Sequence, residues 1–197
     1  MKQLIIMAIA GMLSASCSAI KVEEQIVQDF VKEKNLKNNP NASPAYLIEE
    51  SGPSAKSLEY YQMAYADKSL PAGKKRIEVL PGSFKNWPID ENELAQLQES
   101  NKAGQSESWN SKNFNSLDIP IISRKDLEYE IARQVLPPTS SGNIISRPIV
   151  TADGKYALFY YYSFLPMSSI AKKVCLAKKV NNRWLIEAEF YDPNVFQ

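Results

Sequence analysis

Short runs of apolar and aromatic residues, separated by turn-forming residues, fill the stretch from residue 144 to residue 191, and this pattern predicts β-structure. Three to four strands are expected, each rich in aromatic and β-branched side chains, over residues 144–150, 156–163, 173–180 and 183–191. Asp153-Gly154 and Asn181-Asn182 lie between neighbouring strands, and both pairs tolerate the positive φ angles of tight hairpins. The sequence therefore predicts an antiparallel meander at the C-terminus.

Two of these strands differ in how many apolar faces they present. In residues 183–191 the apolar side chains alternate with more polar ones, so we expect one buried face and one largely solvated face. The predicted buried face consists of Trp184, Ile186, Ala188 and Phe190. In residues 156–163 both faces are apolar or aromatic. That strand is expected in the centre of the sheet, covered by helices on both sides.

A helical period replaces the alternation near the N-terminus. Apolar side chains at positions 22, 26, 27, 30 and 31 share one helical face, which predicts an amphipathic helix. A stretch with two prolines, Pro40 and Pro44, follows it.

Two further helix starts combine a capping box with a hydrophobic staple. In the first, Asp90 is the cap and Glu93 its partner, and the helix is expected to end near Glu99. In the second, Ser123 is the cap and Asp126 its partner. We expect an apolar stripe of Leu127, Ile131 and Val135 along this second helix, which Pro137-Pro138 ends.

The region of residues 40–88 is less clearly patterned. Tyr46–Glu49 and Arg76–Leu80 are expected to be short strands, whereas Ser57–Ala66 is compatible with a helix or a strand. Residues 100–116 are rich in Ser, Asn and Lys and predict a long exposed loop, which Trp109 and Phe114 would attach to the body of the protein.

Together these patterns predict a single α+β domain over residues 20–197. It would consist of an N-terminal amphipathic helix, two further helices and the C-terminal antiparallel meander. This order of elements is compatible, by analogy alone, with an NTF2-like fold.

The first residues have the organisation of a secretory signal. Lys2 precedes an unbroken apolar run from Leu4 to Leu13, and small residues follow it. The run has ten residues, whereas a membrane-spanning helix needs about 20. Small residues before Cys17 resemble a bacterial lipobox, which predicts a signal peptide of residues 1–16 and lipidation of Cys17. The usual leucine position is Ser14, so cleavage after Ala19, giving a signal of residues 1–19, stays an alternative.

Composition excludes several classes of chemistry. Lys and Arg number 23 against 22 Asp and Glu, a balance that gives no support to nucleic-acid binding. No histidine is present, which removes Ser-His-Asp and Cys-His catalysis and histidine-bound zinc. Cys17 and Cys175 are the two cysteines, and Cys175 stands in an apolar stretch typical of a buried thiol. No cofactor and no metal site is expected, and no catalytic residue stands out.

The segments SRPIVTADGKYALFYYY and CLAKKVNNRWLI carry a resemblance to known proteins. They are similar to the terminal hairpins of uncharacterised secreted proteins and lipoproteins of Bacteroidetes-type bacteria. The resemblance covers roughly 50 residues. It implies a cell-envelope location and implies no activity, because that family has none assigned.

The remaining candidates for function are aromatic side chains and one arginine in the predicted sheet. Tyr160, Tyr162, Trp184 and Arg147 are the hypothetical ligand or partner face, since rings with polar tips suit such surfaces. Filling of the sheet by bulky side chains explains the tyrosines equally well. Our leading hypothesis is an exported, lipid-anchored envelope protein that binds a protein or small ligand without catalysis. Two alternatives stay open, a hydrolase or isomerase that uses an aromatic-lined pocket without histidine, and an inhibitor or immunity-type partner of a secreted protein.

Overall fold

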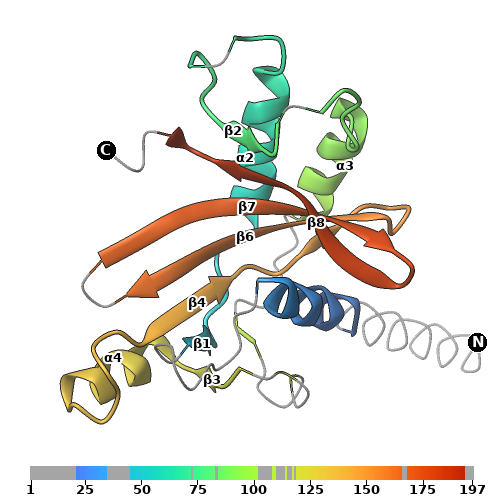
Figure 1. The fold of residues 1–197 in the computed structure, drawn as a ribbon. Helices are drawn as coiled ribbons and strands as arrows, with labels where there is room; N and C mark the ends of the chain where they lie inside the picture. Colours follow the sequence, from blue (N-terminus) through green and yellow to red (C-terminus); the bar gives the residue numbers. More distant parts are fainter. Residues whose placement is uncertain are drawn as a thin grey trace, which may run out of the picture.

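The protein is an α+β structure built on an eight-stranded mixed sheet (Figure 1). The computed structural model describes residues 21–34, 45–71, 73–82, 84–101, 108–109, 114, 117, 119–165 and 168–193, with the backbone alone for 164–165 and 168–171. The strand order is β2-β8-β7-β6-β4-β1-β3, and β5 pairs with β6 beside β4. The strands are β1 Ala45–Ile48, β2 Glu78–Leu80, β3 Ile121–Ile122, β4 Ser141–Ile145, β5 Ile149–Val150, β6 Tyr156–Leu165, β7 Ser168–Val180 and β8 Arg183–Tyr191.

The predicted C-terminal meander is confirmed, with its first strand divided in two. β6, β7 and β8 pair antiparallel in sequence order, and β4 and β5 both pair antiparallel with β6. Ser146 lies at the division. Its backbone N–H donates to the Tyr160 carbonyl at 2.8 Å, and its hydroxyl accepts from the Tyr160 N–H at 2.8 Å. Pro148, which has no N–H to donate, follows, so the ladder resumes only at Ile149.

A β-bulge changes the face that β8 presents. Leu176 of β7 pairs with Ala188, but the next residue, Ala177, pairs with Ile186, so Glu187 is the extra residue of β8. Because side chains alternate along a strand, the extra residue moves the later side chains to the opposite face. Trp184 therefore packs in one core and Phe190 in the other, and the predicted single buried face of this strand is wrong.

Strand β6 is central, as predicted, and helices cover both of its faces. The N-terminal helix, residues 21–33 and blue in Figure 1, buries Ile26, Val27, Phe30 and Val31 on one face. On the other face, α2 Ala55–Ala66 and α3 Glu91–Asn101 pack over Leu158 and Tyr160. Full burial of a large apolar side chain stabilises the fold by about 1.5–3 kcal/mol.

The two predicted capped helix starts are confirmed. The Glu93 N–H donates to Asp90 Oδ1 at 2.9 Å at the start of α3, which ends at Asn101. The Asp126 N–H donates to Ser123 Oγ at 3.0 Å at the start of α4 Arg124–Ala132.

The predicted apolar stripe of α4 is only partly correct. Leu127 is fully buried, but Val135 is 61% exposed. The helix ends at Ala132, and Gln134 adopts a φ of 60°, so Val135 lies beyond the helical face before the two prolines are reached.

The weakly patterned region of residues 40–88 contains a helix, α2, in addition to the three helices that the sequence predicts. Residues 57–66, left open between helix and strand, belong to α2. The short strands predicted near residues 46 and 78 are present, but β1 pairs parallel with both β3 and β4. Of the predicted 100–116 loop, Trp109 and Phe114 are buried with their ring centroids 5.2 Å apart, which confirms their attachment to the body.

Candidate functional site

The four residues predicted to share a ligand face lie on two sides of the sheet. Tyr160 and Tyr162 face α2, where the Tyr160 ring contacts Tyr60 at a centroid distance of 6.2 Å and Tyr162 at 5.6 Å. Arg147 and Trp184 belong to the opposite side, beneath the N-terminal helix. Because the sheet separates the two pairs, the structure does not bring the four together.

Arg147 joins three segments of the chain. Its Nη1 donates to Glu23 Oε2 at 3.0 Å, its Nη2 donates to the Ser108 carbonyl at 2.6 Å, and its guanidinium lies 3.9 Å from the Trp109 ring centroid. Only 8% of Arg147 is exposed. Burial raises the pKa of Glu23, and the attraction of Arg147 opposes that shift. The arrangement is that of an internal ion pair.

Trp184 and Tyr160 are also core residues. Trp184 is 2% exposed, and its backbone N–H donates to Asp29 Oδ2 at 2.9 Å. Tyr160 is 5% exposed, and burial raises the pKa of its hydroxyl. Tyr162 is half-buried and reaches the small core beside α4. Bulky filling of the sheet, the alternative reading of the tyrosines, therefore agrees with their positions.

Of the two cysteines, the structure describes only Cys175. Cys17 and the predicted signal of residues 1–16 or 1–19 lie outside the described residues. Cys175 is fully buried in β7, and burial raises the pKa of its thiol, as expected for an unreactive side chain. Within the described part of the chain, no helix is long and apolar enough to cross a bilayer.

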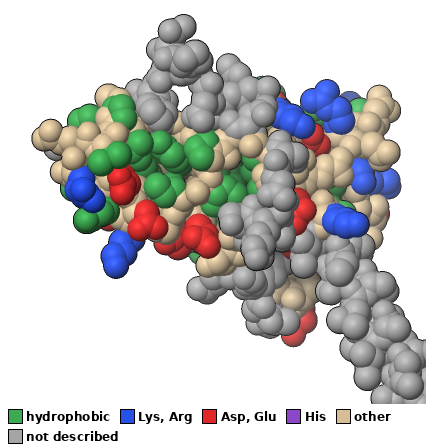
Figure 2. All heavy atoms as spheres, turned by 90° about the horizontal axis from the view of Figure 1, so that it is seen from below, with side chains coloured by type: hydrophobic (Ala, Val, Ile, Leu, Met, Phe, Trp, Pro, Cys, Tyr) green, Lys and Arg blue, Asp and Glu red, His purple; other side chains and the backbone are tan. Residues whose placement is uncertain are grey.

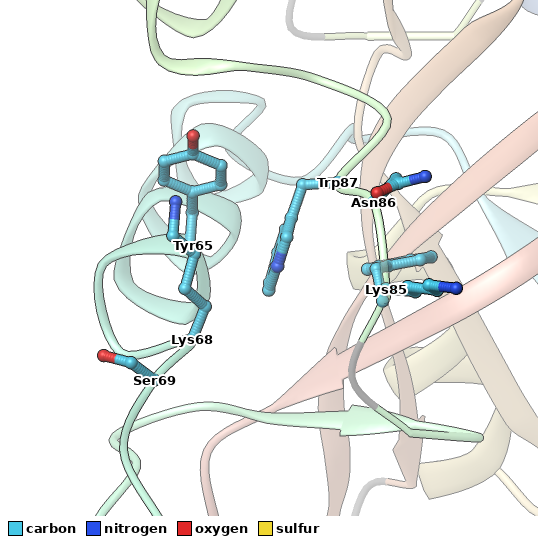
Figure 3. A pocket seen from close by; sticks show the side chains of 7 residues that line it. Tyr65, Lys68, Ser69, Lys85, Asn86 and Trp87 are labelled. Carbon is cyan, nitrogen blue, oxygen red and sulfur yellow. The ribbon is translucent and has the colours of Figure 1, made fainter.

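An aromatic notch beside the end of α2 is a candidate ligand surface among the residues that the structure describes (Figure 3). It has a volume of about 530 Å³, within the range of roughly 300–1,000 Å³ typical of small-molecule sites. Its lining residues are Tyr65, Lys68, Ser69, Phe84, Lys85, Asn86 and Trp87. We call these seven residues the aromatic notch.

The rings of the aromatic notch support one another edge to face. Trp87 lies 5.4 Å from Tyr65 and 5.3 Å from Phe84 between ring centroids. Behind them, Tyr61 of α2 contacts Trp87 at 5.4 Å and exchanges two hydrogen bonds with the Ile89 backbone, at 2.9 and 3.0 Å. Such pairs add about 0.5–1.5 kcal/mol each to area burial. The packing of these rings and the hydrogen bonds of Tyr61 thus fix the positions of Tyr65 and Trp87, whose outer parts are exposed.

The notch has a positive electrostatic character. Lys68 and Lys85 line it, and none of its seven residues is acidic. Lys68 Nζ lies 3.6 Å from the Tyr65 ring centroid, so that ring already holds a cation. Lys85 is exposed and has no ion pair with any residue that the structure describes. The lining thus carries two ammonium groups, which lie on opposite sides of Trp87 (Figure 3), and no carboxylate.

An ion pair between Asp67 and Arg76 joins the two ends of the chain segment that follows α2. Asp67 accepts from the Arg76 N–H at 3.0 Å, from Nε at 2.9 Å and from Nη2 at 2.9 Å. These bonds hold the pKa of Asp67 at about 2. Asp67 is adjacent to Lys68, so the pair fixes the backbone that carries one of the two notch lysines.

The notch continues into a groove between α2 and α3. One part of this groove shares Tyr65 and Lys68 with the notch and extends to Glu91 and Leu94. Gln62 and Gln98 bridge the helices with a hydrogen bond of 2.9 Å. An elongated ligand could thus extend from the aromatic notch along the helix pair.

Two features that can accompany catalysis are a cluster of metal ligands and a carboxylate with a raised pKa. No group of three or more His, Cys, Asp or Glu side chains among them is arranged to hold a metal ion. Burial raises the pKa of the Glu23 carboxyl, but Glu23 is paired with Arg147 on the far side of the sheet from the notch.

Comparisons with known proteins return no match. No protein family, no curated protein and no solved structure matches the chain.

Sequence reasoning missed the notch. The sequence pattern does not single out Tyr65, Phe84, Trp87, Lys68 or Lys85 as candidate site residues. A signal was present, because Phe84 and Trp87 follow the Pro81-Gly82 turn in a segment without strand or helix periodicity. Aromatic side chains in such a surface segment either pack against another element or are available to bind a ligand. Their proximity to Tyr65 required the tertiary fold.

Proposed function

We propose that the chain is an exported protein, anchored to the bacterial cell envelope by lipid on Cys17, and that it acts as a non-enzymatic binding module. Its partners would be the membrane surface, through the lipid, and a ligand in the aromatic notch. The N-terminal pattern of Lys2, an apolar run and small residues before Cys17 supports export and lipidation. If the signal is instead removed after Ala19, the protein is secreted or periplasmic.

The aromatic notch is the observation that carries the binding proposal. It combines accessible ring surface, two lysines and the Asn86 amide, with no acidic side chain in its lining. This combination favours an anionic ligand that has a flat, apolar face. An acidic oligosaccharide has that chemistry, because its ring C–H groups can lie on an aromatic side chain while its carboxylates meet ammonium groups.

Titration of the intrinsic tryptophan fluorescence tests the binding proposal. Trp87 lines the notch, whereas Trp109 and Trp184 are at most 2% exposed. A galacturonic acid tetrasaccharide should change the fluorescence, and a neutral cellulose tetrasaccharide should bind far more weakly. Lys85→Gln should weaken binding about tenfold, the lower end for a hydrogen bond to a charged group. Lys125→Gln, on the exposed surface of α4, is the matched control.

Two results would contradict the oligosaccharide assignment. One is equal binding of the acidic and neutral sugars, and the other is equal loss of binding in the Lys85 and Lys125 variants. Binding of a tetraglutamate peptide in place of the sugar would assign the notch to an acidic protein partner instead.

Labelled palmitate tests the anchor independently of the ligand. Incorporation in the native bacterium that disappears in Cys17→Ala is the expected result. A mature chain that begins at Ile20 would exclude lipidation.

The alternative functions have weaker support. A hydrolase or isomerase with an aromatic pocket would need a desolvated carboxylate near Tyr160 or Tyr162, whereas Glu23, whose pKa burial raises, lies on the opposite side of the sheet from them. An inhibitor or immunity-type role would be favoured by repeated co-purification with one secreted protein. Kinship with the Bacteroidetes-type lipoproteins and an NTF2-like fold remain predictions, the latter supported by the long β6–β7–β8 hairpins.

A further inference from the structure

Three structural features meet at one end of the sheet. The β7–β8 turn at Asn181 and Asn182 lies beside the start of the N-terminal helix, since Gln25 Nε2 donates to the Asn182 carbonyl at 2.5 Å. The turn between β5 and β6 is next to them, because the Lys179 N–H donates to the Lys155 carbonyl at 2.8 Å. Figure 1 shows both turns and the beginning of this helix at its right-hand side. We call this region the hairpin end.

The hairpin end is basic. Its five basic side chains are Lys21, Lys155, Lys178, Lys179 and Arg183. Asp153 pairs with Lys155 at 2.9 Å, and Glu187 pairs with Lys178 at 3.4 Å. The other three have no ion pair with any residue that the structure describes. Figure 2 shows several Lys and Arg side chains toward the right-hand end of the molecule.

The same end exposes large apolar side chains. Val180 is 39% exposed and Leu185 is 41% exposed. In the pairing of β7 with β8, Val180 is opposite Arg183 and Lys178 is opposite Leu185, so apolar and basic side chains stand together. This mixture is typical of surfaces that rest on the headgroups of an anionic bilayer.

We propose that the hairpin end is the membrane-facing surface of the protein and orients the domain on an anionic bilayer. The inference rests on the proposed lipid anchor at Cys17. From Cys17 to Lys21, where the described helix begins, the chain has only four peptide steps, which span at most about 14 Å. An anchored domain must therefore keep the start of its first helix close to the headgroups.

Electrostatic attraction selects the orientation in this short-tethered arrangement. Each lysine or arginine near an anionic surface strengthens the association about fivefold. Three basic side chains without ion pairs therefore favour contact through the hairpin end. The aromatic notch lies on α2 and residues 84–87, across the sheet from the N-terminal helix, and would stay accessible to a ligand.

The experiment couples the chain from residue 17 onward to vesicles through a maleimide lipid. Cys175 is fully buried, so Cys17 is the thiol that reacts. One set of vesicles is pure phosphatidylcholine, and the other contains about one part in three of phosphatidylglycerol. Lysine acetylation is followed by mass spectrometry, with Lys179 at the hairpin end and Lys125 on α4 as the control.

The expected result is slower acetylation of Lys179 on the anionic vesicles and an unchanged rate for Lys125. Arg183→Glu should reduce the protection of Lys179 about fivefold or more, whereas the matched variant Lys125→Glu should leave it unchanged. Circular dichroism of both variants checks that they are folded. Equal acetylation of Lys179 on the two vesicle types, or protection of Lys125 instead, overturns the proposal.

The failure of this inference is distinct from the failure of the proposed anchor. The maleimide supplies the attachment, so the acetylation rates report only on the hairpin end. Palmitate labelling reports only on Cys17 in the native bacterium. Protection of Lys179 without palmitate incorporation would support the membrane-facing hairpin end and contradict the lipidation of Cys17.

Discussion

Arg147 contacts two segments of the chain that are far from it and from each other in the sequence. Its guanidinium pairs with Glu23 of the N-terminal helix, donates to the Ser108 carbonyl and lies over the Trp109 ring. Side-chain exposure is only 10% for Arg147 and 14% for Glu23, so water screens the pair weakly. Removal of Arg147 would leave the Glu23 carboxylate buried without this partner, whereas removal of Glu23 would leave Arg147 its contacts with Ser108 and Trp109.

Arg147→Ala is expected to lower the free energy of unfolding by about 3 kcal/mol, since it leaves the Glu23 carboxylate without its partner. Glu23→Gln should cost less, about 1 kcal/mol, because Arg147 keeps the Ser108 carbonyl and the Trp109 ring. Urea denaturation followed by circular dichroism measures both values. Equal losses in the two variants would contradict this account of the pair.

The Asp67–Arg76 pair predicts a loss of stability in acid. Its hydrogen bonds hold the folded-state pKa of Asp67 at about 2, below the ordinary value. A lowered carboxyl pKa contributes stability that is present above about pH 4 and is lost as the pH falls toward 2. Asp67→Asn should therefore flatten the dependence of unfolding free energy on pH in this window. Denaturation at several pH values measures it, and an unchanged slope would show that other groups dominate.

At the scale of single elements, β8 shows how one residue changes the contacts of a strand. Glu187 is the extra residue at the bulge, so Trp184 packs below the N-terminal helix while Phe190 packs beneath α2. Both cores receive a large ring from the same strand. The bulge therefore links the two layers that lie on either side of the sheet.

Deletion of Glu187 is expected to destabilise the protein by more than about 4 kcal/mol, because it would turn the side chains on one side of the bulge onto the wrong face. Glu187→Ala keeps the extra residue and should change stability by less than about 1 kcal/mol, since its ion pair with Lys178 is partly exposed. Thermal denaturation of the two variants compares them. A deletion variant as stable as the alanine variant would refute the role of the bulge.

At the scale of the whole molecule, two large cores share one central sheet. Cys175 lies in the core beneath the N-terminal helix, and its neighbours in β7, Val174 and Leu176, lie in the core beneath α2 and α3. Opening either layer would expose the strands that support the other. This arrangement favours cooperative unfolding of both layers.

Cys175 should therefore report on global unfolding. In a chain with Cys17→Ser, a thiol reagent such as dithionitrobenzoate should react with Cys175 only when the protein opens, because the side chain is fully buried. Arg147→Ala should accelerate this reaction in proportion to its loss of stability. A fast reaction in the unsubstituted protein, independent of added urea, would indicate local opening at β7.

Particular residues show how far the sequence predicts the fold. The caps at Asp90 and Ser123 were predictable because a cap depends on side chains three positions apart. The central place of β6 was predictable because both of its faces are apolar. The bulge at Glu187 was not, since the alternation of β8 is uninterrupted in the sequence. The aromatic notch was not predictable either, because Tyr65 and Trp87 meet only after α2 and the following loop pack together.

The sequence by itself determined the local features of this protein, namely the N-terminal amphipathic helix, the capped helices, the C-terminal hairpins and the signal-like segment before Cys17. Each depends on side chains within a few positions of one another, where periodicity and turn chemistry act. Only the tertiary structure decided the parallel pairing of β1, the partners of Arg147 and the assembly of the aromatic notch. These features join distant segments, and the packing of the whole chain chooses among the many pairings that local patterns allow.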